Sequence, residues 1–228
     1  MPDNLDTEKK SHSHLLRTKK LKFTLTNFCS SLGETETNKQ IDAAFSVWQS
    51  VCGLSFQKVK LSEDKGNCEI KISFLTDHDA PNTVLTHKTN CPYKLNGQKG
   101  RTSAHAFYSG KNAISEDIPF DSETWKHQKT VPGDRKYNLC SAASHELGYA
   151  LGVYHFNEKD SVMTPFYKHG FSTENMHEIP GESNKALIQQ MYGKPTEGKS
   201  VEMKAVFNST KAKAIIRKNV KNSQPEKV

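Results

Sequence analysis

A chain of 228 residues is long enough for one domain with a hydrophobic core, and a hydrophobic content of 34% indicates polar ends around a folded centre. Residues 194–228 contain nine Lys or Arg and three Glu, so they carry +6 of the formal net charge of +7. No run approaches the roughly 18 apolar residues that a membrane span needs, and the first 20 residues lack the apolar centre of a signal peptide.

The first part of the chain alternates strand and helix patterns. Residues 20–28, KLKFTLTNF, alternate apolar and polar side chains and predict a strand. Residues 37–51 have the apolar spacing of an amphipathic helix. The alternation returns in 54–59 and 68–74, which predict two further strands.

The second part is rich in loops before two helices. Residues 76–136 abound in Asn, Gly, Pro, Asp and Thr, which predicts long loops around short strands such as TSAHAFY, 102–108. One helix is predicted over about 138–151 and a shorter one over 183–193, where Gly193 suits a helix C-cap. This order of elements, without an internal repeat, predicts an α+β domain.

The segment SHELGYALGVYH, residues 144–155, carries the chemistry of the chain. Residues four apart lie on the same face of a helix, so His145 and Tyr149 can point at one ion. Zinc binds imidazole nitrogens at about 2.0–2.1 Å and keeps an open position for water in catalytic sites. Glu146 would lie beside that zinc-bound water as general base.

The end of the same segment supplies another ligand. Gly152 can adopt a positive φ and end the helix, so that the chain turns and returns His155 to the ion. The arrangement HELGYALGVYH follows the H-E-x-x-H-x-x-G-x-x-H pattern of metzincin proteases, except at Tyr149. We therefore predict a zinc centre at His145 and His155, with Glu146 as its catalytic base.

The surrounding stretches resemble the matrixins, the matrix metalloproteinase family, over roughly residues 20–193. Met163 looks like the Met-turn that underlies the metzincin zinc, and SVWQSVCGLSF, SAHAFYSG, DIPFDSETW and ALIQQMYG also match. PFY resembles the wall of the S1′ pocket, which assigns Pro165 and Tyr167 to substrate binding. The resemblance implies a twisted, mostly parallel sheet of about five strands with three helices, the histidine helix ending at a glycine turn before the Met-turn.

Tyr149 occupies the position of the second zinc-binding histidine of the family. A tyrosine oxygen can bind zinc, because the ion favours deprotonation of the phenol despite its reference pKa near 10. That oxygen lies farther from the backbone than an imidazole nitrogen, so the helix and the ion cannot both keep their usual positions. Two interpretations stay open: Tyr149 is a third ligand, or it fills space over a weakened or empty site.

The structural zinc of matrixins is held by three histidines and an aspartate, and this chain matches that site poorly. His105 matches one of the histidines, but Pro119 stands where the next is expected and offers no ligand. His78 and Asp79 do not align with the spacing of the family. We expect this zinc to be lost and His105 to be a packed side chain.

The resemblance also implies calcium. Asp121 and Glu123 match calcium ligands of the family across a one-residue deletion, so we take them as candidate calcium ligands. Carboxylates in loops are usually only solvated, and this simpler interpretation stays open beside the metal site.

The expected domain organisation has three parts: a flexible N-terminal segment at 1–19, a matrixin-like metallopeptidase domain at 20–193, and a basic, disordered tail at 194–228. The opening MPD matches the end of the P-R-C-G-x-P-D segment whose cysteine caps the zinc of matrixin zymogens. We hypothesise that residues 1–19 include the remnant of a pro-region and that a signal and a pro-region lie upstream.

Three functions are compatible with the sequence. The first is a secreted, extracellular zinc endopeptidase that acts as a monomer on proteins or peptides, such as extracellular-matrix proteins, without binding specific nucleic acids. The second is a pseudopeptidase that binds protein segments or inhibitors in the same cleft by strand-edge pairing and does not cut them. The third is a binder of matrix or polyanions through the basic tail.

Overall fold

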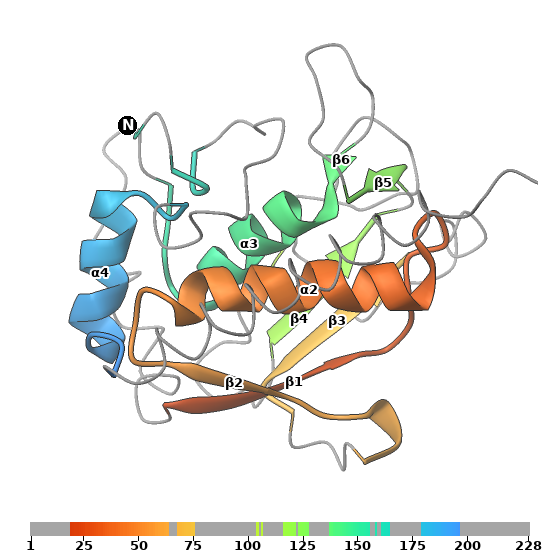
Figure 1. Cartoon of the computed structure of the whole chain (residues 1–228), viewed down its shortest axis with the longest axis horizontal. Helices are drawn as coiled ribbons and strands as arrows, with labels where there is room; N and C mark the ends of the chain where they lie inside the picture. Colours follow the sequence, from red (N-terminus) through yellow and green to blue (C-terminus); the bar gives the residue numbers. More distant parts are fainter. Residues whose placement is uncertain are drawn as a thin grey trace, which may run out of the picture. The chain divides into compact units, whose positions relative to one another are not determined.

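The computed structural model describes residues 19–63, 68–75, 104, 106, 116–121, 123–127, 137–155, 158, 161–164 and 179–196. The chain divides into two units, Met1–Lys194 and Pro195–Val228. All helices and strands of the described residues belong to the first unit (Figure 1). Beyond residue 196, the basic tail lies outside the described residues.

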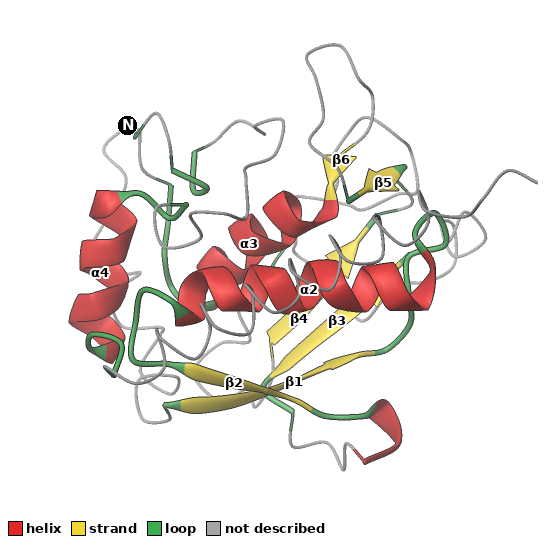
Figure 2. Ribbon diagram, in the orientation of Figure 1, coloured by secondary structure: helices red, strands yellow, loops and turns green. Residues whose placement is uncertain are grey.

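The first unit contains a four-stranded parallel sheet in the order β2-β1-β3-β4 (Figure 2). Its strands are β1 Lys20–Leu25, β2 Ser55–Lys58, β3 Ile70–Phe74 and β4 Glu116–Phe120. The first three confirm the predicted strands with shorter ends. β4 was not predicted as a strand, because Pro119 and the acidic residues around it give no alternating pattern.

A segment of opposite direction lies beyond β4. Ala104 forms an isolated antiparallel bridge with Phe120, in the stretch 102–108 where a short strand was predicted. Among the described residues the sheet therefore has four strands and this bridge, where about five strands were expected. The α+β class and its mostly parallel sheet are confirmed.

Three α-helices occur among the described residues: α2 Gly33–Gln49, α3 Leu139–Ala150 and α4 Glu182–Tyr192. A 3-10 turn, η2 Leu61–Glu63, and two short paired strands, β5 Trp125–Lys126 and β6 Tyr137–Asn138, complete the elements. α2 begins four residues before its predicted start, and the acidic Glu34 and Glu36 in its first turn suit the positive end of a helix.

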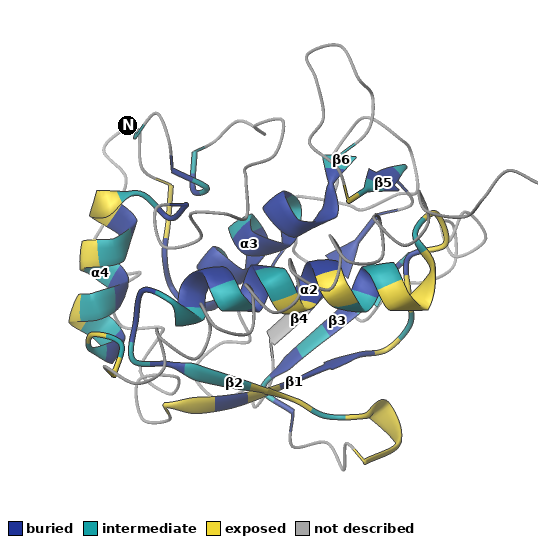
Figure 3. Ribbon diagram, in the orientation of Figure 1, coloured by how far each residue is buried: buried dark blue, intermediate teal, exposed yellow. Residues whose placement is uncertain are grey.

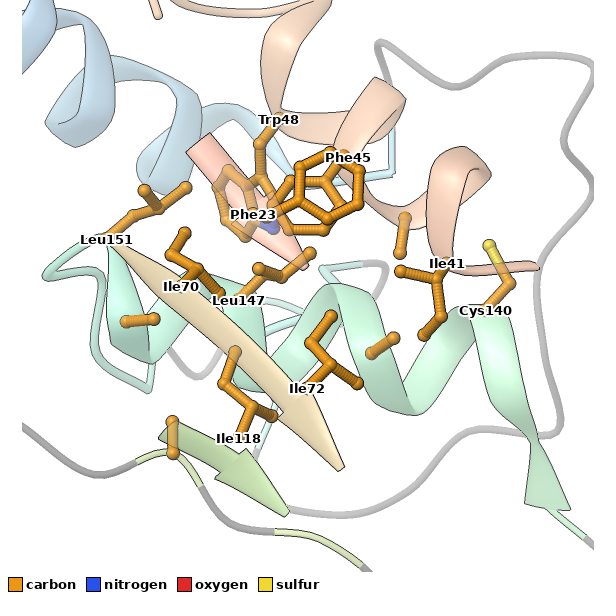
Figure 4. Close-up of a cluster of buried hydrophobic side chains, with 14 of the residues drawn as sticks. Phe23, Ile41, Phe45, Trp48, Ile70, Ile72, Ile118, Cys140, Leu147 and Leu151 are labelled. Atoms are coloured by element: carbon orange, nitrogen blue, oxygen red, sulfur yellow. The ribbon is translucent and has the colours of Figure 1, made fainter. Parts of the chain in front are cut away.

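α2 and α3 pack against each other and each contacts the sheet, so they cover the same face of it (Figure 1). Their inward sides are buried, whereas the outer side of α2 is exposed (Figure 3). The close-up in Figure 4 shows Phe23 and Phe45 beside Trp48, with Ile70 and Ile72 of β3 facing α3. The Phe23 and Phe45 rings stack with centroids 3.7 Å apart.

Trp48 ties the two helices together. Its side chain is fully buried, and its Nε1–H donates a 2.8 Å hydrogen bond to the backbone carbonyl of Ser144 on α3. A buried indole that satisfies its one donor contributes both apolar contact and a fixed helix register. The register of α3 against α2 matters because α3 carries the predicted histidine segment.

α4 fastens the end of α3. The Tyr192 hydroxyl donates to the Leu151 carbonyl at 3.0 Å, which satisfies one of the carbonyls left unpaired at the C-terminus of α3. Gln189 Nε2 donates to the Val51 carbonyl at 2.8 Å, just after α2. Gly193 ends α4 with a φ of 85°, as its C-cap position predicts.

Gly148 lies in the middle of α3 at a point of close approach. A Cβ at this position would meet the Met163 Sδ on one side and lie 2.7 Å from Trp48 Cζ2 on the other, both well inside normal contact. α3 can therefore sit this close to α2 and to Met163 only with glycine at 148.

Gly148→Ala is expected to destabilise the protein by about 1–3 kcal/mol because it overpacks this contact. Intrinsic helix propensity alone predicts the opposite, that Gly148→Ala stabilises the protein by about 1 kcal/mol. The measurement is the free energy of unfolding in urea. Ala142→Gly on the same helix is the reverse control, and its lower helix propensity should reduce the free energy of unfolding by about 1 kcal/mol. A Gly148→Ala variant that is more stable than the wild type would contradict the close packing at Gly148.

Candidate metal centre

α3 presents the predicted ligands from one face and then turns sharply. Asn138 caps its start by accepting from the Ser141 N–H at 2.8 Å. At its end Gly152 has a φ of 88° and donates to the Tyr149 carbonyl at 2.9 Å, while Val153 N–H donates to the Gly148 carbonyl at 2.8 Å. This pair of bonds is a Schellman cap, and it confirms the predicted glycine turn.

The turn brings His155 to the side chains of His145 and Tyr149. The three ring centroids form a nearly equilateral triangle, with separations of 5.1, 5.2 and 5.1 Å. The Nε2 atoms of His145 and His155 are 3.3 Å apart, and the Tyr149 Oη is 2.5 Å from His155 Nε2. The three residues predicted to form one site thus lie together, with Tyr149 Oη and His145 Nε2 both close to His155 Nε2.

One hydrogen bond assigns the tautomer of His145. His145 Nδ1 lies 2.7 Å from the backbone carbonyl of Val162, an acceptor, so Nδ1 carries the proton and Nε2 carries a lone pair. His155 Nε2 lies within hydrogen-bond distance of both the Tyr149 Oη and this His145 Nε2, at 2.5 and 3.3 Å. Imidazole nitrogens this close together are the kind of group that binds zinc.

Desolvation lowers the pKa of both imidazoles. Burial lowers the pKa of His145, and the nearby His155 lowers it further, although the bond to the Val162 carbonyl acts in the opposite direction. Partial desolvation also lowers the pKa of His155, whose ring packs on Tyr149 and His145 although the residue as a whole is exposed. Neutral imidazole is the form that binds a metal ion.

The donor set fits a zinc ion in part. Two ligands of a tetrahedral zinc with bonds of about 2.0–2.1 Å lie about 3.3–3.4 Å apart, which the two histidine nitrogens match. The Tyr149 oxygen is closer to His155 than this, by roughly 0.8 Å, because it forms a direct hydrogen bond. Among the described residues no three His, Cys, Asp or Glu side chains are grouped to hold a metal, and the third polar group beside the two histidines there is the Tyr149 phenol.

Glu146 lies one position further round α3 and is 9% exposed. Burial raises the pKa of its carboxyl to about 7, and a hydrogen bond with the backbone N–H of Ala106 partly opposes that shift. Ala106 follows the Ala104 bridge, so the edge of the sheet reaches the carboxyl. A carboxyl with a pKa near 7 suits proton transfer at neutral pH.

Met163 is fully buried and packs against α3 at Gly148, one helical position before Tyr149. Its sulfur therefore lies under the helix that carries the ligands, which is the placement predicted for the Met-turn. The neighbouring Val162 supplies the carbonyl that holds His145. Pro165 and Tyr167, predicted to line the substrate pocket, lie outside the described residues.

The candidates for the other metal sites are only partly described. Asp121 and Glu123 are buried, at 1% and 6% exposure, which is uncommon for carboxylates. The Glu123 N–H donates to the Asp121 carbonyl at 2.7 Å, so the two residues form one tight turn after β4.

At the position of the structural zinc, Pro119 is buried in β4 opposite Ser73. His78, Asp79 and His105 lie outside the described residues.

The sequence did not reveal the residues that position the hydrogen-bond partner of His145 Nδ1, the Val162 carbonyl. Ser161 and Val162 precede Met163 of the predicted Met-turn, but the Ser161–Asn184 contact joins residues 23 positions apart in the sequence. A polar Ser beside the predicted Met-turn, at a position expected to be buried, was the only local signal. Ala106 was missed for a similar reason, because its contribution to Glu146 is a backbone N–H.

Comparisons with known proteins identify the family of this chain. The family model described as Matrixin matches residues 14–193. The chain is 33% identical to human matrix metalloproteinase-16 over 195 residues, 84% of this chain and 28% of that protein. It is 32% identical to Xenopus laevis matrix metalloproteinase-18 over 177 residues, 77% of this chain and 33% of that protein. Rabbit (Oryctolagus cuniculus) interstitial collagenase is 32% identical over 147 residues, 64% and 27% of the two chains.

The fold and site define a metalloendopeptidase-like domain, and the chain belongs to the matrixin family of zinc-dependent hydrolases. The matched region spans a third or less of the length of these relatives. Within the described part of the chain, no helix is both long and apolar enough to cross a membrane.

Gly152→Ala is expected to cost about 1–2 kcal/mol, because an L side chain at a φ of 88° meets the following backbone. Gly152→Asn is the matched control and should cost less, since asparagine tolerates the left-handed region. Urea unfolding of the two variants tests the turn. Equal costs for alanine and asparagine would show that φ at 152 is not the limiting constraint.

Proposed function

We propose that this domain is a zinc endopeptidase in which His145 and His155 hold the ion and Tyr149 supplies the third protein donor. The close approach of two imidazole nitrogens and a phenol oxygen supports this proposal, together with the buried carboxyl of Glu146. The 3.3 Å separation of the two Nε2 atoms, which matches two ligands of a tetrahedral zinc, is the single observation that carries it. Zinc, when bound, would supply a Lewis acid that stabilises negative charge on the substrate oxygen.

Glu146 is the general base of the proposed reaction. Its carboxylate takes a proton from the water that attacks the peptide carbonyl, and the resulting acid returns that proton to the leaving amine. A carboxyl with a pKa of about 7 can perform both transfers near neutral pH. The bond from Ala106 orients it toward the edge of the sheet, where an extended substrate can pair with backbone groups.

The remaining parts of the proposal follow the family. Pro165 and Tyr167 line the pocket for the residue after the scissile bond, and the substrates are proteins, such as those of the extracellular matrix. The site of action is extracellular. Asp121 and Glu123 bind calcium as a stabilising ion, and the structural zinc is lost because Pro119 offers no ligand.

A second function is favoured by the hydrogen bond between Tyr149 Oη and His155 Nε2 at 2.5 Å. This contact engages the nitrogen that His155 would give to zinc, so metal binding must first break it. If the contact outlasts exposure to zinc, the domain is a pseudopeptidase that binds extended protein segments without cutting them.

Zinc content and peptide cleavage together separate the two functions. The wild-type protein is expected to retain one zinc ion after dialysis and to cleave a fluorogenic peptide. Glu146→Gln should keep the ion and lose about 10²–10⁴-fold in rate, as removal of a general base does. Tyr149→Phe should weaken zinc binding by at least about 10–100-fold, and Tyr149→His should strengthen it.

Tyr154→Phe is the matched control, because it removes a phenol hydroxyl from an exposed tyrosine next to His155. It should leave zinc content unchanged. A wild-type protein that takes up no zinc and cuts nothing, while Tyr149→His does both, would establish the pseudopeptidase instead.

Calcium is expected to raise the thermal midpoint of the protein, because an ion held by the carboxylates of Asp121 and Glu123 would bind the folded chain and not the unfolded one. At 100 times the dissociation constant, the gain is about 2.7 kcal/mol. Calorimetry with calcium and with chelator measures it. Glu123→Gln should reduce the shift, whereas Glu63→Gln on an exposed turn should not; an equal shift in both variants would rule out this site.

A further inference from the structure

The peptide group between Val162 and Met163 has both of its polar atoms engaged at the metal centre. Its carbonyl, on Val162, accepts from His145 Nδ1 at 2.7 Å. Its N–H, on Met163, donates to the Ser161 hydroxyl at 3.0 Å. A peptide group is planar, so a bond on each side determines its orientation. The Ser161 hydroxyl therefore decides where the Val162 carbonyl points.

The Ser161 hydroxyl has no remaining freedom. It donates to the Pro180 carbonyl at 2.7 Å and accepts from Asn184 Nδ2 at 2.6 Å, in addition to the Met163 N–H. A hydroxyl has one donor and two acceptor positions, and all three are used. Ser161 and Asn184 are 1% and 0% exposed, so water does not compete for these bonds.

Asn184 in turn belongs to the first turn of α4. Its Nδ2 also donates to the Pro180 carbonyl at 3.0 Å, just before the helix. Two further contacts fix the same two segments: the Val162 N–H donates to the Ile179 carbonyl at 2.9 Å, and Glu158 accepts from the first N–H groups of α4 at 2.9 and 3.1 Å. The start of α4 is thus a rigid support for the peptide group that faces His145.

We propose that Ser161 and Asn184 are positioning residues of the metal centre. They hold the Val162 carbonyl against His145 Nδ1, which keeps the proton on that nitrogen and presents the Nε2 lone pair to the ion. The proposal rests on the proposed function in that His145 is a ligand, but its effect on the tautomer exists in the metal-free protein too. Hydrogen bonds behind a ligating histidine commonly set its tautomer and ring orientation.

The tautomer of His145 is the direct test. Metal-free protein with ¹⁵N-labelled histidine is studied by NMR at a pH where the imidazole is neutral, and the His145 signals are assigned by their loss in His145→Gln. The wild type should carry the proton on Nδ1. Ser161→Ala should shift the population toward the Nε2–H tautomer several-fold, and Asn184→Ala should do so to a smaller extent because the Ser161 hydroxyl remains.

Gln189→Ala is the matched control on the same helix. It also removes a side chain to backbone bond of α4, to the Val51 carbonyl at 2.8 Å, but at the end away from the metal centre. It should lower stability without moving the tautomer ratio. If Ser161→Ala does not fold, Asn184→Ala carries the comparison with Gln189→Ala alone.

Zinc and cobalt titrations give a second measurement. Ser161→Ala should bind either ion about 10–100-fold more weakly than the wild type, and Gln189→Ala should match the wild type. An unchanged tautomer ratio in both Ser161→Ala and Asn184→Ala, or an equal change in Gln189→Ala, would overturn the positioning role. If the wild type binds no zinc but Ser161→Ala still shifts the His145 tautomer ratio, the proposed function is refuted and this inference stands.

Discussion

The close approach of α3 to Trp48 and Met163 at Gly148 is the constraint on which the rest of the site depends. Without a Cβ at 148, the helix settles between the indole of α2 and the methionine sulfur. The close approach of Gly148 to Trp48 and Met163 sets how near α3 lies to α2, and with it the positions of His145 and Tyr149. Since protein interiors are close-packed, a contact of this kind transmits small displacements to the site instead of absorbing them.

Tyr149 changes what the centre does before any metal binds. Where the family pattern has another imidazole, this chain has a phenol, whose Oη lies 2.5 Å from His155 Nε2. This contact engages the ring nitrogen that His155 uses as a ligand in the proposed function. Metal binding, as proposed, therefore competes with this hydrogen bond for one nitrogen.

The fold and the candidate site could be predicted where the local pattern and the final structure agree. The strands at 20–28 and 68–74 alternate because one side faces α2 and α3, and the turn at Gly152 is visible because few other residues adopt its φ. β4 was missed because Pro119 interrupts its pattern, and the first turn of α2 because its residues are polar. The Ser161–Asn184 contact could not be predicted, because nothing local to either residue indicates the other.

The sequence by itself determined which chemical groups are available: two imidazoles, a phenol, a carboxyl and a glycine turn, at spacings that place them on one helix and in the segment that follows it. Those spacings act through local geometry, which the chain carries wherever it folds. Only the tertiary structure decided their protonation and direction. The Val162 carbonyl assigns the proton of His145, burial near Ala106 raises the pKa of Glu146, and the reach of Tyr149 brings it to His155. Each of these contacts is made only when the folded chain brings the two residues together, and its energy depends on the packing around both of them.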